Sequence, residues 1–281
     1  LMTILLIQPF QVIKTSMIII YNKQERVRMR DIVRKIKTEE GLSGFYRGFL
    51  PSVIKSTFGY AIFFSSLEFN KKLLNKAINN NDKFDNKIKK ENISKNNCAI
   101  NFAASGISRL IQVFAVNPIM IIKTRSEVLG FDYYKNIKDA IKKIKNEEGY
   151  KGFYTGLKTT LMKDIPASGL FYMCYEFIKG EIKSFGVENV QIQAIISSSL
   201  TSLFLVLLTN PLEIIRTRQQ CQHFSTNLEN NYSGISQGIY KIYKFEGISG
   251  FFVGVVPRLL KKGLGCIIMW TTYESLKNEK L

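Results

Sequence analysis

Apolar residues in this chain gather in long windows that are separated by basic, polar stretches. Five windows each hold roughly the 20 residues with which an α-helix crosses a ~30 Å hydrocarbon core. They cover Phe49–Phe69, Ala99–Ile122, Leu157–Ile178, Val190–Ile215 and Val255–Leu276. Glycine and serine recur inside them, as in helices that pack closely in lipid. The pattern predicts an all-α membrane protein, and buried helices of a soluble protein are the less favoured alternative.

The segment Lys71–Asn97 differs in composition from the windows on either side. It contains 8 Lys, 8 Asn and only 3 acidic residues. Such a composition cannot bury a hydrophobic core, so we predict a solvated or disordered loop. A contact between its lysines and anionic lipid is an alternative of lower weight.

Three motifs occur three times each, always in the same order, and define an internal repeat. The first surrounds a proline and reads QPFQVIKTS, NPIMIIKTR and NPLEIIRTR at Gln8–Ser16, Asn117–Arg125 and Asn210–Arg218. The second combines an acid, glycines and aromatic residues at Glu40–Gly48, Glu148–Gly156 and Glu246–Gly254. The third pairs a glutamate with a lysine at Leu67–Lys71, Tyr175–Lys179 and Tyr273–Lys277.

Amphipathic stretches lie between the first and second motifs, for example YKNIKDAIKKIKNEEG at Tyr134–Gly149. Their apolar residues recur near helical spacing with lysines between them, which predicts a short surface helix. Each repeat is therefore a span, a surface helix and a second span, and three repeats give six spans. We place the repeats at residues 1–97, 98–189 and 190–281.

With these motifs the sequence resembles the mitochondrial carrier family over essentially its whole length. The resemblance implies six tilted transmembrane helices in three pseudo-symmetric repeats around a water-filled cavity, each repeat with a short matrix-side surface helix. It implies a monomer in the mitochondrial inner membrane that works by alternating access, with one substrate site and a gate on either side. It implies no enzyme activity.

The proline motif supplies the matrix gate in this family. Residues i and i+3 share one helical face, so its acid and base can both face the cavity. The proline removes a backbone hydrogen bond and kinks the helix, which draws the helix ends together. In the family the acid of each repeat pairs with the base of the next. The contacts carried over are Gln11 with Lys123, Met120 with Arg216, and Glu213 with Lys14, of which only the last is an ion pair.

The third motif supplies the cytoplasmic gate, and there every pair is complete. The resemblance pairs Glu68 with Lys179, Glu176 with Lys277, and Glu274 with Lys71. An ion pair stabilises by roughly 0–1 kcal/mol when solvated and by more when partly buried. We therefore expect a resting preference for the matrix-open state, in which this complete gate is closed.

Ionisable residues inside the even-numbered spans mark the expected substrate site. Lys55, Lys163 and Lys261 each lie seven residues beyond the last glycine of the second motif, and Asp164 follows Lys163. Charged residues within a span indicate a substrate path, although snorkelling lysines are an alternative. Three lysines attract an anion and Asp164 offers a partner for an amine, so a small zwitterionic amino acid fits both. In the family this level also holds the substrate contacts.

Three stretches carry a finer resemblance, to the branch of the family that transports glycine into the matrix for haem synthesis. They are NPIMIIKTRSEVLGFDY, GLKTTLMKDIPASGLFYMCYE, and GFFVGVVPRLLKK with MWTTYE after it. The chain departs from the pattern at Gln11, where an acid is expected, and at Ser16, where a base is expected. Lysine also stands where arginine is expected at the contact positions, which keeps the charge but loses the bidentate grip on a carboxylate.

The glycine elements should begin helices whose free backbone amides can bind lipid phosphate. The resemblance makes cardiolipin the bound lipid, and a plain turn is the competing interpretation. Only eight residues precede Pro9, which span ~12 Å of helix, so we expect that further sequence precedes this chain.

Composition narrows the remaining alternatives. The 281 residues include 40 Lys and Arg, 22 Asp and Glu, and a single histidine, His223, for a net charge of +18. The four cysteines, Cys98, Cys174, Cys221 and Cys266, have no metal-ligand spacing, so we expect neither a metal nor a cofactor. A basic nucleic-acid-binding protein would cluster its charge on one face without long apolar spans.

We therefore predict a carrier that moves a small amino acid, with glycine as the expected substrate. Other amine-bearing solutes, namely S-adenosylmethionine, ornithine and acylcarnitine, are the alternatives within the transporter class.

Overall fold

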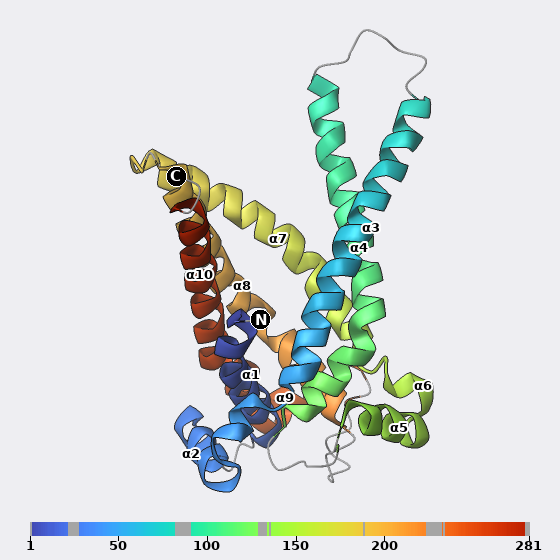
Figure 1. Ribbon diagram of the computed structural model, residues 1–281, viewed down its shortest axis with the longest axis vertical. Coiled ribbons are helices and arrows are strands. Elements are labelled where there is room, and N and C mark those ends of the chain that lie inside the picture. Colours follow the sequence, from blue (N-terminus) through green and yellow to red (C-terminus); the bar gives the residue numbers. More distant parts are fainter. Residues whose placement is uncertain are drawn as a thin grey trace.

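The computed structural model describes residues 2–21, 28–81, 91–128, 134, 136–187, 189–222, 232 and 234–278. In this part of the chain the regular structure is entirely helical, which confirms the predicted fold class. Six long helices dominate it (Figure 1), and every predicted span falls inside one of them. They are α1 (Met2–Ile20), α3 (Phe49–Asn81), α4 (Glu91–Ser126), α7 (Leu157–Ser184), α8 (Val190–Cys221) and α10 (Val255–Asn278).

The long helices form a closed ring. Each one packs against its neighbour along the chain, and α10 packs against α1 to complete the circuit. The motif prolines Pro9, Pro118 and Pro211 lie inside α1, α4 and α8, as predicted. Both α1 and α4 also contact α8 across the ring. The three proline-containing helices thus converge at one end of the molecule, which we call the closed end.

Short helices cover the closed end. They are α2 (Met29–Glu39), α5 (Ile137–Glu147) and α9 (Ile235–Glu246), and each is followed by a brief turn of helix: η1 (Gly41–Tyr46), α6 (Gly149–Gly152) and η5 (Ile248–Phe252). Each short helix buries residues four apart, such as Ile32 with Ile36 and Ala140 with Ile144, and turns its lysines outward. This spacing confirms the surface helices predicted from the amphipathic stretches.

The tightest hydrophobic packing lies between the short helices and the ends of the long ones. One cluster joins α1, α2, α8 and α9 through residues that include Ile18, Ile36, Ile214 and Ile242. A second joins α4 and α5 through Ile121, Ile122, Ala140 and Ile144, together with Phe153 after α6. The core therefore anchors the closed end, where burial is most complete. At the opposite, open end, α3 and α4 diverge from α8 and α10 (Figure 1).

The prediction of a loop over Lys71–Asn97 is wrong for most of its length. Helix α3 continues to Asn81 and α4 already begins at Glu91, while residues 82–90 lie outside the described part. The composition shows that this segment cannot form a hydrophobic core. It does not show that the segment cannot form a helix, which is where the prediction went wrong. Lysine is a good helix former, and a solvated helix can extend beyond a span without burying anything.

Three described segments are long and apolar enough to cross a membrane by composition alone: Thr3–Ile20, Gly106–Ser126 and Val190–Cys221. They belong to α1, α4 and α8. The other long helices α3, α7 and α10 carry the lysines predicted for the substrate site, which lowers their apolar character.

Candidate functional site

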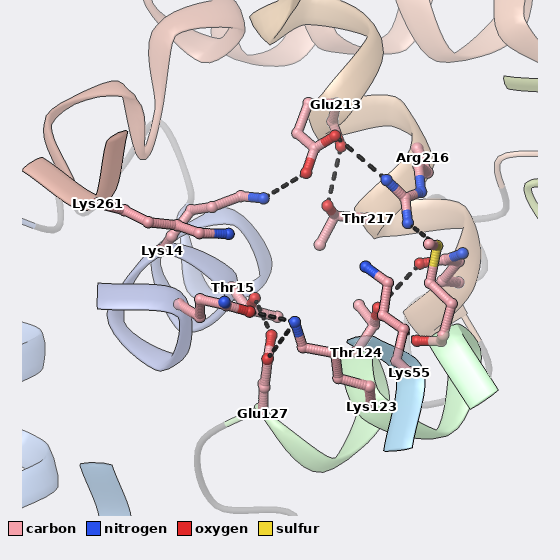
Figure 2. Close-up of a pocket in the computed structure, with 13 residues that line it drawn as sticks. Lys14, Thr15, Lys55, Lys123, Thr124, Glu127, Glu213, Arg216, Thr217 and Lys261 are labelled. Carbon is pink, nitrogen blue, oxygen red and sulfur yellow. Dashed lines mark hydrogen bonds and ion pairs between the residues drawn. The ribbon is translucent and has the colours of Figure 1, made fainter. Parts of the chain in front are cut away.

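A cavity of about 80 Å³ lies beside the gate residues of α1, α4 and α8, and Figure 2 shows the side chains that line it. Helices α1, α3, α4, α8 and α10 all contribute side chains to it. Its charged lining consists of the cations Lys14, Lys55, Lys123, Arg216 and Lys261 and the carboxylates Glu127 and Glu213. The cavity is strongly polar and carries an excess of positive charge.

Glu213 on α8 is the centre of the gate in this conformation. It forms an ion pair with Lys14 of α1, the one complete pair expected for the matrix gate. Its second oxygen accepts a hydrogen bond from Lys163 Nζ of α7 at 2.8 Å and lies 3.4 Å from Arg216 Nη1. One carboxylate therefore joins three cations from three helices.

Gln11, which replaces the gate acid of repeat 1, accepts a hydrogen bond from Lys123. A second residue supplies the missing charge, because Glu127 Oε1 lies 3.5 Å from Lys123 Nζ. Glu127 is buried, and its other oxygen accepts a hydrogen bond from Thr15 Oγ1 at 2.8 Å. This corner of the gate is therefore an ion pair between Lys123 of α4 and the residue that directly follows α4, and this residue also contacts α1.

Met120, which replaces the gate acid of repeat 2, has no such substitute. Arg216 points its Nη2 group at the Met120 sulfur, a weak acceptor, and its Nε has no hydrogen-bond partner in the described part of the chain. The third corner thus holds a buried cation with incomplete partners.

The four residues predicted to bind substrate fall into two pairs. Lys55 and Lys261 line the cavity, and within the described part of the chain neither has a hydrogen-bond or ion-pair partner. Lys163 and Asp164 lie beside the cavity and are already paired with each other at 3.1 Å. Asp164 also lies 3.6 Å from Arg109.

Of the pairs predicted for the opposite gate, only Glu68 with Lys179 lies wholly among the described side chains. Glu68 and Glu176 are exposed, and among the described side chains no ion pair joins Glu68 to Lys179. Lys179 lies over the ring of Tyr175, and Lys71 is partly buried. The side chains of Glu274 and Lys277 lie outside the described part. The structure thus shows the conformation closed at the short helices, and the expected preference for the opposite state stays a prediction.

Glycines of the second motif hold the gate cations in place. Gly48, Gly156 and Gly254 have φ of +66°, +74° and +72°, a region that favours glycine. A Cβ atom added to each would lie 3.3, 3.5 and 3.4 Å from the backbone oxygens of Lys123, Arg216 and Lys14, respectively. Each glycine element therefore packs against the helical turn that carries the base of the next repeat.

Sequence analysis missed two residues of this site. Glu127 follows Lys123 by four positions, a spacing that places both on one helical face and could have identified it. Arg109 is a charge inside the apolar window of α4, and such charges commonly mark functional positions. Neither residue belongs to a threefold motif, which is why a search for repeats passes over them.

Each sequence repeat supplies two of the six long helices, and the first of the two contains a motif proline. The gate contacts lie between successive repeats. A sequence profile described as "Mitochondrial carrier protein" matches residues 1–77, 94–185 and 188–280. The chain belongs to the mitochondrial carrier family. Members of this family are transporters and not enzymes, and this carrier is a multi-pass protein of the mitochondrial inner membrane.

Relatives of the carrier differ in the solutes given in their names. The human mitochondrial glycine transporter is 27% identical over 97% of this carrier and 84% of the relative. Mitochondrial substrate carrier family protein M of Dictyostelium discoideum is 31% identical over 91% and 82%. The mitochondrial nicotinamide adenine dinucleotide transporter 2 of Arabidopsis thaliana is 31% identical over 87% and 65%. Family membership therefore establishes solute transport more firmly than it establishes the solute.

Proposed function

We propose that this carrier moves a small zwitterionic amino acid across the inner membrane, with glycine as the substrate and matrix haem synthesis as its use. The observation that carries the proposal is the pair Lys55 and Lys261, which have no partner among the described residues and line a small cavity that also contains carboxylates. A cavity of about 80 Å³ is well below the roughly 300–1,000 Å³ of pockets for drug-sized ligands. A small charged solute can contact both signs of charge in a space of this size.

The charges give each end of an amino acid a partner. Lys55 and Lys261 would bind the carboxylate, since neither has to release another group first. Lys163 would join them by exchanging Glu213 for the substrate. Asp164 would receive the ammonium group, with Glu213, which contacts the same Lys163 Nζ, as a second carboxylate. The exchange at Lys163 would link substrate binding to the gate, because Glu213 also holds Lys14.

Cardiolipin belongs to the same proposal as the expected lipid. The elements around Gly44, Gly152 and Gly250 precede α3, α7 and α10, whose first backbone amides have no partner within the helix. Transport should therefore be measured in liposomes that contain this lipid.

The test is uptake of labelled glycine by the purified carrier in cardiolipin-containing liposomes. Serine, ornithine, S-adenosylmethionine and nicotinamide adenine dinucleotide serve as alternative substrates. We expect Lys55→Gln and Asp164→Asn to lower glycine uptake roughly tenfold or more, since a hydrogen bond to a charged group contributes about 1.5–3 kcal/mol. Lys158→Gln is the matched control, because this lysine is exposed on α7.

Glycine uptake no greater than in empty liposomes, with one of the other solutes transported, would move the proposal to that solute. Unchanged glycine uptake by Asp164→Asn would remove Asp164 from the substrate site.

A further inference from the structure

The corner of the gate around Arg216 is electrostatically incomplete. Arg216 is 9% exposed, and among the described residues its Nε has no hydrogen-bond partner. Its Nη2 meets the Met120 sulfur, and its Nη1 reaches Glu213 only at 3.4 Å. Glu213 is already shared with Lys14 and Lys163. A buried guanidinium normally has a full set of acceptors, so this corner lacks one.

Other cations face the same space. Figure 2 shows Lys55 on the Arg216 side of the cavity, with Lys14 and Lys261 on the other side. Lys55 lies within electrostatic reach of both Arg216 and Lys123, and all of these are like charges. The cavity lining has five cations and two carboxylates. Both carboxylates are engaged, Glu213 by three cations and Glu127 by Lys123 and Thr15.

An excess of buried positive charge is costly unless an anion compensates it. The position of the missing acceptor is also indicated by the repeat, because Met120 stands where repeat 3 has Glu213, which pairs with Lys14, the base of the next repeat. A negative group beside Arg216, near the Met120 side chain, would therefore compensate the excess positive charge.

We propose that Arg216, Lys55 and Met120 frame a binding site for a small monovalent anion, which takes the place of the missing gate acid. The ligand is a carboxylate or an inorganic anion of similar size. It comes either from the carboxylate of the transported solute or from free anion such as chloride. Closure of the gate then depends on anion binding, whereas the corner formed by Lys14 and Glu213 closes on the chain's own charges. The site does not require that glycine be the solute.

Thermal unfolding of the full-length carrier in detergent with cardiolipin tests the site. Acetate or chloride replaces gluconate, a larger anion, at constant ionic strength. We expect acetate or chloride to raise the Tm of the wild-type protein by roughly 2–4 °C, because an anion that binds only the folded state stabilises it. Met120→Glu supplies the negative charge within the chain, so this variant should lose most of the response. Met120→Leu, which keeps an apolar side chain of similar size, should retain it.

A wild-type Tm that is the same in gluconate, acetate and chloride would overturn the proposal, as would a full response in Met120→Glu. If Met120→Glu does not fold, Lys55→Gln replaces it: a response reduced several-fold supports the site, and a response equal to that of the control Lys158→Gln contradicts it. A response to acetate and glycine without one to chloride identifies the solute carboxylate as the ligand, and a response to chloride identifies free anion. Absence of glycine uptake in liposomes, with the anion response intact, would overturn the proposed substrate and leave this site standing.

Discussion

In repeats 2 and 3, a single arginine joins the proline-containing helix to the acid–glycine motif and to the next repeat. In repeat 1, two residues, Ser16 and Arg47, share the contacts with the acid and with the next repeat. In repeat 2, both terminal nitrogens of Arg125 bind the carboxylate of Glu148, one of them at 2.8 Å. Arg125 also donates to Tyr134 Oη at 3.3 Å and, through Nε, to the backbone oxygen of Gln220 at 2.7 Å. One fully buried side chain thus ties α4, the following glycine element and the next repeat together.

Repeat 3 has the same arrangement. Arg218 binds Glu246 through both terminal nitrogens, one at 2.9 Å, and donates to Tyr232 Oη at 3.0 Å. Its Nε donates to the backbone oxygen of Ile18 at 3.2 Å. Ile18 occupies the position in α1 that Gln220 occupies in α8, so the contact with the next repeat is also equivalent.

Repeat 1 has Ser16 at the arginine position. The Ser16 hydroxyl donates to the backbone oxygen of Glu127 at 3.3 Å, which preserves the contact with the next repeat. The charge comes from Arg47 instead, whose Nε lies 2.5 Å from Glu40 and whose Nη1 donates to the Val128 backbone oxygen at 3.2 Å. The acid of the second motif and the next repeat are again contacted by an arginine, but this arginine belongs to the second motif and not to the proline motif.

The comparison teaches that a repeat can conserve a contact while moving the residue that makes it. The Arg47 position holds Thr155 in repeat 2 and Val253 in repeat 3, where the arginine of the proline motif makes the charge redundant. The exchange also changes burial, since the side chain of Arg47 is 17% exposed and that of Arg125 is 0% exposed. We therefore expect the Arg47 contacts of repeat 1 to contribute less to stability than the Arg125 and Arg218 contacts of repeats 2 and 3.

The largest effect should come from Arg125→Ala. The substitution leaves Glu148 and the Gln220 carbonyl without their donor and opens a cavity at a fully buried position. We expect a loss of about 3–5 kcal/mol, seen as a drop in Tm of roughly 10 °C in detergent. Lys142→Ala, at an exposed position of α5, is the control. A Tm within a degree of this control would show that the fastening contributes little to stability.

A smaller effect should follow Arg47→Val, which introduces the residue that repeat 3 has at this position. The charged contact with Glu40 and the contact with the Val128 backbone oxygen are lost, and water can partly replace them. We expect a loss of about 1–3 kcal/mol in the same measurement. Thr155→Val makes the corresponding change in repeat 2, where the arginine fastening is intact, and should stay within about 0.5 kcal/mol of wild type. Equal effects of the two substitutions would contradict the division of contacts in repeat 1.

The sequence predicted some elements of the fold and not others. The long apolar windows predicted the spans, because every residue of a span faces lipid, another helix or the cavity. The amphipathic period predicted α2, α5 and α9. Neither pattern predicted that α3 would continue to Asn81, because the Lys- and Asn-rich sequence at its end contains no long apolar window.

The site was predictable where residues recur threefold and not where the chain departs from the repeat. The ion pair of Lys14 with Glu213 follows from the motif. The roles of Glu127 and Arg47 do not, because each compensates for a substitution elsewhere, at Gln11 and Ser16. The hydrogen bond between Lys163 and Glu213 likewise joins two different motifs, and only the packing of α7 against α8 brings them together.

The smallest net change in stability is expected when the arginine of repeat 1 is moved to the position that it has in repeats 2 and 3. Combining Arg47→Val with Ser16→Arg gives repeat 1 the arrangement of repeat 3, with Glu40 available as the partner. We expect the double variant to unfold within about 1 kcal/mol of wild type, although Ser16 is fully buried and Ser16→Arg alone should destabilise by placing two guanidinium groups around one carboxylate. A double-mutant cycle should then give a coupling energy of about 1–3 kcal/mol in favour of the pair. Additive effects would mean that α1 and η1 cannot accommodate the arginine, so that the division of contacts is fixed by the packing around Ser16 and not by charge alone.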